Sequence, residues 1–392
     1  MSDYPFFQHA TPAFRTFWGG RSLASLPKEL DRLGCRRAVI VSDPWMLTRP
    51  DIIESIEAEL GARMAGLFTG VEMHSPVPSV ESARDVLEGA GADAVVALGG
   101  GSSIVTARAA TILLAEGLPI RELCTRRDAD GRLTSPRLNA PKIPNWVIPS
   151  TPITAYAKAG SAVRDPVTGE RLALYDPKTR AQGIIIDPNV ALSAAVGLAQ
   201  AAALNAFSMA VESLQAGVDD PLADALLLHS LKVLAEWLPR LRSAPDDAEP
   251  RIRLMLGALM CGQGSDYVGG GLAQALSHAA GPRSSVGNGM VEALLLPHTM
   301  RFNSTATTGR LALVAQVLSS TLQSAFDGDE EAVIAVESVL DVLDVPRRLR
   351  DVGVTQEAIP EIVHHALDDW SIMQSPRKVD RENLTELLEA AW

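Results

Sequence analysis

Short apolar runs alternate with stretches of helical spacing through the first half of the chain. Residues 37–44 contain the uninterrupted run Ala-Val-Ile-Val, which is typical of a strand buried on both faces of a parallel sheet. Residues 66–71 and 94–98 predict two further short strands, and the intervening segments 52–60 and 80–88 carry apolar residues at intervals of three and four. Strands separated by helices in this rhythm predict a parallel α/β sheet, with ligands bound beyond the carboxyl ends of the strands.

The pattern changes its character near residue 190. Before that point we expect a polar loop over 124–144, a strand at 146–151, a β-hairpin at 160–175 and a last strand at 183–188. After that point, Ala, Leu and Met at helical spacing dominate the chain. We therefore predict an α/β domain over residues 1–189 and a helical domain over 190–392. The helices of the second domain should break near Pro245, 269–271, 281–289, Pro346 and Pro376.

Composition and charge argue against several classes of protein. The chain has 392 residues, of which 47% are hydrophobic, so it is long enough for two domains with sizeable cores. A net charge of −12 argues against a nucleic-acid surface, which needs clustered Lys and Arg. No apolar run approaches the ~20 residues that span a bilayer, and the first ten residues lack a secretory signal pattern. We expect a cytoplasmic protein whose cysteines, Cys35, Cys124 and Cys261, are small buried side chains.

The apolar run at 94–98 ends at three glycines, Gly99, Gly100 and Gly101, after which a helical pattern begins. Glycines let the backbone approach a ligand closely, and the first N–H groups of the new helix are free to bind an anion. The hydroxyl-bearing Ser102 and Ser103 follow at once. We therefore predict a phosphate site, with a turn that merely packs strand against helix as the alternative. Because the glycines are not spaced as G-x-G-x-x-G, the turn names no cofactor.

Other polar residues stand at the ends of neighbouring strands. Asp43 follows the strand at 37–42, and Ser150 with Thr151 closes the strand at 146–151. Parallel strands place these carboxyl ends at one edge of the sheet, so we assign all three residues to the same nucleotide site. Asp43 would bind the ribose hydroxyls of a nucleotide. The alternative is that its side chain caps the next helix.

Seven motifs occur in an order that resembles the iron-containing alcohol dehydrogenase superfamily, and within it the maleylacetate reductase branch most closely. They are Ser42-Asp43, Gly99-Gly100-Gly101-Ser102, Ile148-Pro149-Ser150-Thr151, Ile186-Asp187-Pro188, Leu204-Asn205-Ala206 with Val211-Glu212, Leu296-Pro297-His298 with Asn303, and Pro376-Arg377. The resemblance implies a Rossmann-like parallel sheet followed by an all-α domain, the dehydroquinate synthase-like fold. It also implies NAD(H) as cofactor, a small-molecule substrate, and a homodimer formed through residues 14–19.

Metal-dependent members of that superfamily hold their ion with an Asp, a His one helical turn later, and two further His residues. The matching positions here are Asn205, Met209, Gln274 and Asn288. Three amides and a thioether are poor ligands for Fe²⁺ or Zn²⁺, which prefer carboxylate and imidazole. We therefore predict no catalytic metal, and we assign the four residues to the substrate pocket.

Two further departures from the family pattern affect the predicted site. The helix after the glycines carries Arg108 where the family usually has a Lys, which we expect to keep a positive charge near the phosphates. The segment 152–158 replaces the Gly-Ser-Glu run of the reductases and introduces Tyr156 and Lys158. By the resemblance, this segment borders the nicotinamide and the substrate, so we expect an altered pocket.

Three residues are candidates for the chemistry. His278 matches a histidine that the family retains beside the metal, and an imidazole titrates near neutral pH, so we predict that it is the general acid. Tyr156 or Lys158 could donate a hydrogen bond to an oxyanion, and Lys158 could also hold a substrate carboxylate. The alternatives are a histidine bonded within the helical core and a lysine on the surface. We expect His298 to be structural.

Taken with the resemblance, these residues predict a metal-independent NAD(P)H-dependent reductase that transfers hydride to a carbonyl or enone-like carbon of a small, carboxylated substrate. Asp43 would favour NADH by repelling the 2′-phosphate of NADPH. One alternative is a non-redox lyase, dehydratase or cyclase on the same scaffold, with acid–base chemistry by His278 and Tyr156. A catalytically silent binding subunit is the other.

Overall fold

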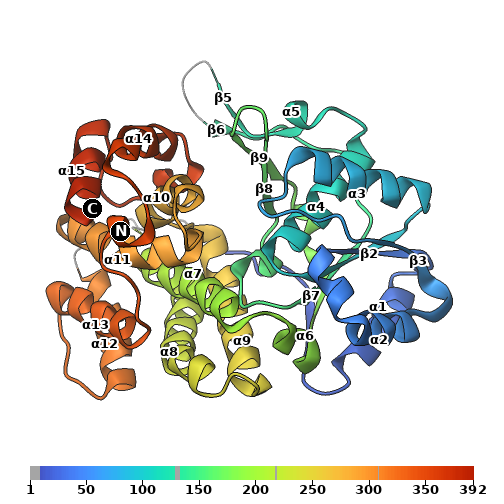
Figure 1. Ribbon diagram of the computed structural model, residues 1–392, viewed down its shortest axis with the longest axis horizontal. Coiled ribbons are helices and arrows are strands. Elements are labelled where there is room, and N and C mark those ends of the chain that lie inside the picture. The colour runs from blue at the N-terminus through green and yellow to red at the C-terminus, as the bar shows by residue number, and fades with distance from the viewer. Residues whose placement is uncertain (1–8, 129–132, 217–218, 308) are drawn as a thin grey trace, which may run out of the picture. The chain divides into compact units, whose positions relative to one another are not determined.

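The computed structural model describes residues 9–128, 133–216, 219–307 and 309–392. The chain forms two compact units. One comprises Pro12–Thr151 and Ala155–Ala195, and the other comprises Val196–Trp392 together with residues 9–11 and Pro152–Thr154. Figure 1 shows a sheet with its helices in the first unit and helices throughout the second.

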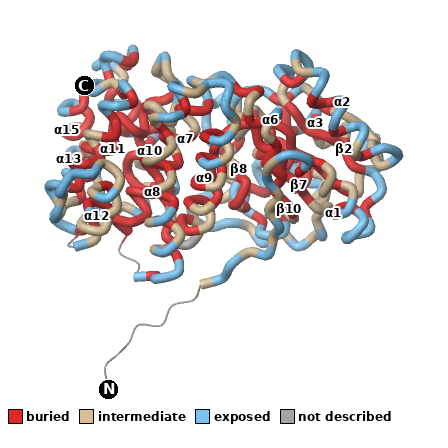
Figure 2. The backbone as a smooth tube through the Cα atoms, turned by 90° about the horizontal axis from the view of Figure 1, so that it is seen from below, coloured by how far each residue is buried: buried red, intermediate tan, exposed pale blue. Residues whose placement is uncertain are grey.

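The sheet unit is built on six parallel strands in the order β1-β10-β7-β4-β2-β3. Their bounds are β1 Arg15–Trp18, β2 Ala38–Ser42, β3 Met64–Phe68, β4 Ala94–Gly99, β7 Asn145–Pro149 and β10 Ala181–Ile186. Every residue of β2, β4 and β7 is buried, as expected for central strands covered by helices on both faces. Figure 2 shows β7 and β10 among the buried segments. The predicted parallel α/β sheet is therefore confirmed.

The helices of this unit lie between the strands in the chain. They are α1 Leu26–Arg32, α2 Pro50–Leu60, α3 Val77–Gly89, α4 Gly101–Glu116, α5 Ile120–Leu123 and α6 Pro188–Ser193. Helix α2 buries Ile52, Ile53, Ile56 and Leu60, which recur at the helical interval, so the pattern seen in the sequence is the face that packs on the sheet. Helix α4 is buried along most of its length, because it packs against both α3 and β4.

The strand order places the ends of β2 and β4 at a topological switch point. After β2 the chain moves to β3 at one edge of the sheet, and it then returns to β4 on the other side of β2. Ser42 at the end of β2 pairs with Leu98 of β4, and Gly99 pairs with Pro149 of β7. Ligands of open α/β sheets bind at such switch points. Asp43, the glycine turn and Ser150 therefore start from adjacent strand ends.

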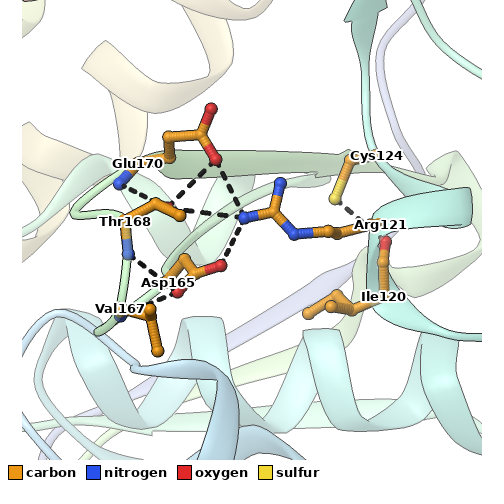
Figure 3. Close-up of polar contacts among 7 residues, drawn as sticks. All are labelled: Ile120, Arg121, Cys124, Asp165, Val167, Thr168 and Glu170. Carbon is orange, nitrogen blue, oxygen red and sulfur yellow. Dashed lines mark hydrogen bonds and ion pairs between the residues drawn. The ribbon is translucent and has the colours of Figure 1, made fainter.

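A β-hairpin of β8 (Gly160–Arg164) and β9 (Arg171–Tyr175) extends from this unit, as the sequence predicts. Figure 3 shows how its turn is held: the Arg121 guanidinium donates to Glu170 at 2.9 Å and also bonds Asp165. Asp165 in turn accepts the backbone N–H groups of Val167 and Thr168. Thus α5 fixes the tip of the hairpin. A second short hairpin, β5 (Arg126–Arg127) with β6 (Leu133–Thr134), was not predicted.

Lys142, at the end of the predicted loop 124–144, is fully buried. Its ammonium lies 2.5 Å from the carboxylate of Glu116, at the end of α4, and 3.0 Å from Asp176. It also donates to the carbonyl oxygen of Ala140 at 2.8 Å. A buried cation with two carboxylate partners is costly to disrupt, since removing it leaves buried negative charge uncompensated. Lys142 therefore ties the loop to the core of the sheet unit.

We expect Lys142→Met to lower the free energy of unfolding by about 3–5 kcal/mol, because Glu116 and Asp176 lose their shared buried partner. Lys178→Met is the matched control, since Lys178 also pairs with Asp176 at 3.0 Å but has a side chain that is 42% exposed. Its loss should cost no more than ~1 kcal/mol. Urea unfolding measures both. Equal costs would contradict the role given to Lys142.

The second unit consists of packed helices. Their bounds are α7 Val196–Gln215, α8 Pro221–Ser243, α9 Ala248–Val268, α10 Leu272–Ala280, α11 Asn288–Asn303, α12 Arg310–Leu322, α13 Asp329–Val342, α14 Ile359–Leu367 and α15 Arg381–Ala391. Four of the five predicted helix breaks fall between these helices, and the fifth, at 281–289, overlaps the first two residues of α11. Helix α7 packs against α8, α9 and α11, and all its residues from Ala206 to Gln215 are buried. None of the helices in the described ranges is long and apolar enough to cross a membrane.

Comparison with the predicted boundaries shows three differences. The second strand of the sheet, β3, begins at Met64 rather than at residue 66 and ends at Phe68. Strand β1 was expected only through the resemblance, as a contact region, whereas here it pairs in parallel with β10 at the edge of the sheet. The helix α6, which lies beyond the expected domain boundary at residue 190 for part of its length, belongs to the sheet unit.

Candidate active site

The turn after β4 has a backbone that only glycine fits at its first position. Gly99 has φ +127°, where residues with a side chain are strained. A Cβ atom there would also lie 2.7 Å from the Asp43 carboxylate and 2.7 Å from the Ser103 hydroxyl. The turn therefore brings Asp43, Gly99 and Ser103 into contact, as the sequence predicts for one site.

The N-terminus of α4 begins in this turn. Gly100 is its N-cap residue, and no side chain among the described residues caps the helix. Ser150 donates its N–H to the carbonyl oxygen of Gly99 at 2.9 Å, and Thr151 Oγ1 lies 3.4 Å from the Cβ position of Gly100. An uncapped N-terminus of a 16-residue helix, with glycines at its first positions, fits a phosphate group. The two hydroxyl residues that follow β7 thus border the same turn.

Asp43 does not cap the helix that follows it. It precedes the short 3₁₀ helix Pro44–Thr48, but its side chain accepts no capping hydrogen bond, so the capping alternative is wrong. One carboxylate oxygen is 3.5 Å from the Ser103 hydroxyl. The other oxygen is buried and has no hydrogen-bond partner in the described part of the chain. An acceptor placed beside a phosphate cradle is free to take a ribose hydroxyl.

Ser102 is held by a strained loop. Its hydroxyl accepts the backbone N–H of His74 at 3.1 Å, and its carbonyl oxygen accepts the Ser75 hydroxyl at 3.0 Å. Both His74 and Ser75 have positive φ, at +66° and +49°, which is costly for residues other than glycine. The Ser102 hydroxyl is therefore engaged within the protein, so of its side chain and backbone N–H only the N–H remains a candidate for binding a phosphate.

Arg108 is not where the sequence suggested. Its guanidinium is fully buried and donates to the carbonyl oxygens of Gly160, at 2.5 Å, and Ala155, at 2.6 Å. It therefore holds the segment that carries Tyr156 and Lys158. Tyr156 is itself fully buried, whereas Lys158 is half-buried. The catalytic roles of these two residues stay predictions.

The four positions that the family resemblance aligns with metal ligands lie on three helices that pack against one another: Asn205 and Met209 on α7, Gln274 on α10 and Asn288 at the start of α11. Asn205, Gln274 and Asn288 are half-buried on helices whose other faces are buried. Met209 is buried, and its sulfur accepts the Ser265 hydroxyl at 3.4 Å. We call these three partly exposed amides on adjoining helices the amide wall; Met209, by contrast, is buried.

A buried carboxylate that the sequence reasoning missed supports this wall. Glu292, one turn after Asn288 on α11, accepts a hydrogen bond from the Asn205 amide nitrogen. The Ser277 hydroxyl of α10 lies 3.4 Å from the same carboxylate oxygen. Glu292 therefore connects α7, α10 and α11. In the sequence, Glu292 could have been identified as a single acid within an otherwise apolar helical run.

Glu212, a second buried acid, binds the backbone N–H groups at the N-terminus of α10. Its carboxylate accepts the backbone N–H groups of Ala273, at 2.5 Å, and Gln274, at 3.0 Å. Gly271 makes room for it, since a Cβ there would lie 2.7 Å from a Glu212 oxygen. Burial raises the pKa of Glu212 to about 7, although the two hydrogen bonds act in the opposite direction. Glu212 thus sets the position of the helix that carries Gln274.

The raised pKa of Glu212 predicts a pH-dependent stability. The folded protein keeps a proton on Glu212 that the unfolded chain releases near pH 4.5, so the free energy of unfolding should fall as the pH rises from about 4.5 to about 7. We expect Glu212→Gln to remove this part of the pH dependence. Urea midpoints of the two proteins measured between pH 4.5 and 7.5 test it, and parallel curves would contradict it.

His278 forms a dyad with a second residue that the sequence reasoning missed. Its Nδ1 atom lies 2.7 Å from the carboxylate of Asp369, and both side chains are nearly buried. Asp369 also accepts the N–H of Ser371, and the Ser371 hydroxyl donates to the Gln274 amide oxygen at 2.9 Å. The Trp370 ring lies 5.7 Å from the His278 ring. An acid bonded to Nδ1 fixes the orientation of the imidazole.

His298, by contrast, takes no part in this arrangement. It lies within α11, and burial together with the charges of Arg301 and Arg348 lowers the pKa of its imidazole. A buried imidazole with a lowered pKa is neutral at physiological pH. This placement agrees with the structural role expected for it.

The donor atoms at the four matched positions do not fit an iron or zinc ion. Amide oxygens and a thioether lack the negative charge or the imidazole nitrogen that these ions require, and the Asn205 amide turns its nitrogen toward Glu292. Within the described ranges, no group of three or more His, Cys, Asp or Glu residues is arranged to hold a metal ion.

Comparison with known proteins places both units in one family. The model of "Iron-containing alcohol dehydrogenase" matches residues 13–188, and that of "Fe-containing alcohol dehydrogenase family, C-terminal" matches residues 199–392. Maleylacetate reductase 2 of Cupriavidus pinatubonensis (strain JMP 134 / LMG 1197) is 30% identical over 387 residues, which cover 99% of this chain and 96% of that protein. The chain belongs to the iron-containing alcohol dehydrogenase family. The predicted relation to its maleylacetate reductase-like branch is confirmed, and so is the predicted enzyme class, an oxidoreductase.

Other members of the iron-containing alcohol dehydrogenase family are nearly as similar. Lactaldehyde reductase of Escherichia coli (strain K12) is 29% identical, covering 96% of this chain and 98% of that protein. Among solved structures, maleylacetate reductase from Agrobacterium tumefaciens is 26% identical with a TM-score of 0.79, covering 99% of this chain and 98% of that chain. Alcohol dehydrogenase from Oenococcus oeni, at 20% identity and a TM-score of 0.90 over 99% and 100%, shows the shared fold alone.

Proposed function

We propose that this family member is a metal-independent, NAD(H)-dependent reductase that acts on a carbonyl or enone-like carbon of a small substrate. The proposal rests on two features that occur in the same chain. One is a phosphate cradle at Gly99 and the N-terminus of α4; the other is the set of amides at positions where an ion would need carboxylate and imidazole ligands. Relatives described as reductases and as an NAD-dependent methanol dehydrogenase support the redox class and the cofactor.

Different residues at the turn would bind different parts of the dinucleotide. The backbone N–H groups of Gly100, Gly101 and Ser102 would bind the pyrophosphate, and Asp43 would accept the adenosine ribose hydroxyls. The negative charge of Asp43 favours NADH over NADPH, because the 2′-phosphate would meet it. The bound cofactor supplies a hydride. Ser103, Ser150 and Thr151 border the same site and would orient the dinucleotide.

The helical unit would supply the proton and polarise the carbonyl. With Nδ1 of His278 held by Asp369, Nε2 can give its proton to the oxygen of the reduced carbonyl group. Preorganised hydrogen-bond donors in a dry site are worth roughly 3–4 kcal/mol each, so amides can take over the role of a Lewis acid. Lys158 would hold a carboxylate at the other end of the substrate, and Tyr156 would donate to the oxyanion.

Titration with NADH tests the redox proposal. We expect a saturable change in nicotinamide fluorescence, with weaker binding of NADPH, in protein whose iron and zinc contents are far below one per chain. No binding at millimolar NADH would leave the non-redox alternative, a lyase, dehydratase or cyclase using His278 and Tyr156. Stoichiometric iron or zinc in protein purified without chelator would contradict metal independence.

We also propose that the protein is a cytoplasmic homodimer whose subunits meet near residues 14–19. Strand β1 lies at the edge of the six-stranded sheet, and the Trp18 side chain on it is 59% exposed. An edge strand with an exposed aromatic residue is a surface that pairing with a second copy would cover. Size-exclusion chromatography with light scattering should give twice the chain mass of 41.7 kDa, whereas a monomer would contradict the proposal.

A further inference from the structure

The three amides of the wall are each turned in a definite direction. Gln274 directs its oxygen inward, where the Ser371 hydroxyl donates to it at 2.9 Å. That oxygen lies only 1.9 Å from the position that a Cβ of Gly270 would take, so the glycine provides the space for it. The Gln274 amide nitrogen has no hydrogen-bond partner among the described residues, and it is not one of their fully buried polar atoms. Gln274 therefore presents N–H donors.

Asn288 is turned the same way. Its amide oxygen is buried against Gly281, 2.0 Å from that residue's Cβ position, without a partner in the described part of the protein. The residue as a whole is half-buried, and its amide nitrogen is absent from the buried unpartnered atoms of the described chain. The accessible end of Asn288 is thus also an N–H donor.

Asn205 is turned the opposite way, and Glu292 is the reason. A carboxylate only accepts hydrogen bonds, so the Asn205 nitrogen must face Glu292 and the Asn205 oxygen must face away. That oxygen makes no hydrogen bond to the described residues and is not fully buried. Donation to a carboxylate also polarises the amide, which strengthens its oxygen as an acceptor. Asn205 therefore presents an acceptor.

We propose that this array recognises an uncharged carbonyl compound with a hydroxyl or N–H group beside the carbonyl. Gln274 and Asn288 donate to the carbonyl oxygen, and Asn205 accepts from the neighbouring hydroxyl or N–H. Glu292 is a positioning residue, because it acts only by fixing the direction of the Asn205 amide. The inference rests on the proposed function, since it names the reacting end of the substrate of that reductase.

Charge supports an uncharged reacting end. Glu292 is buried against the Asn205 amide, and Asp369 is buried beside His278. A carboxylate placed directly beside the reacting carbonyl would approach these acids and would also find an acceptor, Asn205, where it needs a donor. A carboxylate farther along the substrate is not affected by this wall.

The direction of the Asn205 amide can be tested without any ligand. Asn205→Asp places a second carboxylate against Glu292, so we expect the thermal midpoint to fall by about 5 °C or more. Adding Glu292→Gln restores an amide–carboxylate pair with the roles reversed, and most of the loss should be recovered. The control is Asn303→Asp, on the same helix as Glu292. Asn303 donates to the Gln215 amide oxygen at 3.3 Å, so adding Glu292→Gln should not restore the stability that this substitution removes. Equal losses with and without Glu292→Gln would overturn the role of Glu292.

The substrate class is tested with three small ketones: hydroxyacetone, acetone and pyruvate. With NADH-saturated protein we expect hydroxyacetone to drive NADH oxidation, or to raise the thermal midpoint, at about tenfold lower concentration than acetone or pyruvate. In Glu292→Gln the preference should shrink to about twofold. An equal response to the three ketones, or a preference for pyruvate, would overturn the inference. Failure of NADH itself to bind would instead refute the proposed function, and the thermal cycle would still report on the amide array.

Discussion

Replacing His278 with alanine should lower kcat about 10²–10⁴-fold while leaving NADH binding within about twofold, because the imidazole acts on the substrate oxygen and not on the dinucleotide. Its Nδ1 atom is held by Asp369 at 2.7 Å, so in the proposed mechanism Nε2 is the atom that gives up the proton. The measurement is NADH oxidation followed at saturating carbonyl substrate, together with a fluorescence titration of NADH.

Two further variants separate a chemical role of His278 from a structural one. Asp369→Asn keeps the size of the side chain but removes the charge that orients the imidazole, so we expect a large loss in kcat and a changed pH–rate profile. His298→Ala, on α11, removes a half-buried histidine that lies outside the dyad and should change stability but not kcat. A loss of tenfold or less for His278→Ala would show that His278 is structural.

Replacing Gly99 with alanine should weaken NADH binding at least 100-fold, a free-energy loss of about 2.7 kcal/mol. Two costs combine at this position. The backbone has φ +127°, and the new Cβ would lie 2.7 Å from both the Asp43 carboxylate and the Ser103 hydroxyl. Relief of these clashes would displace Asp43 and tilt the start of α4, which together form the predicted dinucleotide site.

The other end of the same helix offers the control for Gly99→Ala. Gly117 ends α4 with φ +64°, but a Cβ there would have nothing within 4 Å. Gly117→Ala should therefore cost about 1 kcal/mol of stability without changing the affinity for NADH. Fluorescence titration and urea unfolding of both variants make the comparison. Normal NADH binding by a folded Gly99→Ala protein would show that the dinucleotide does not lie at this turn.

The elements that could be predicted from the sequence are those with strong local signals. The fully apolar runs of β2, β4 and β7, the turn between β8 and β9, and the glycine and proline breaks between helices all lie as expected. Strand β1 could not be predicted because none of its four residues, Arg15–Trp18, is buried: the outer two are exposed and the inner two half-buried, so the segment has neither an apolar run nor an alternating pattern.

The site was predictable only in part. Motif positions identified Asp43, the glycine turn and the three amides, and the structure brings each set together within its own unit. Asp369 could not be found from local pattern, because it meets His278 across 91 residues of sequence. Arg108 was misread for a related reason: its position on α4 was apparent, but its direction depends on the carbonyl groups of a segment about 50 residues away.

Glu292 could have been predicted from the sequence as a buried residue with a polar partner. A lone acid inside an apolar helical run is rarely buried without a partner, so its presence in α11 signals a polar contact within the helical unit. That contact is the Asn205 amide. The Asn205 amide on α7 is therefore held by a carboxylate supplied from α11.

The most direct measurement is a crystal structure of the protein soaked with NADH. We expect the pyrophosphate at the N-terminus of α4, against Gly100 and Gly101, and no ion among Asn205, Met209, Gln274 and Asn288. An iron or zinc ion seated among those four side chains, or a dinucleotide bound away from the glycine turn, would contradict a reductase that has kept its phosphate cradle and replaced its metal with hydrogen bonds.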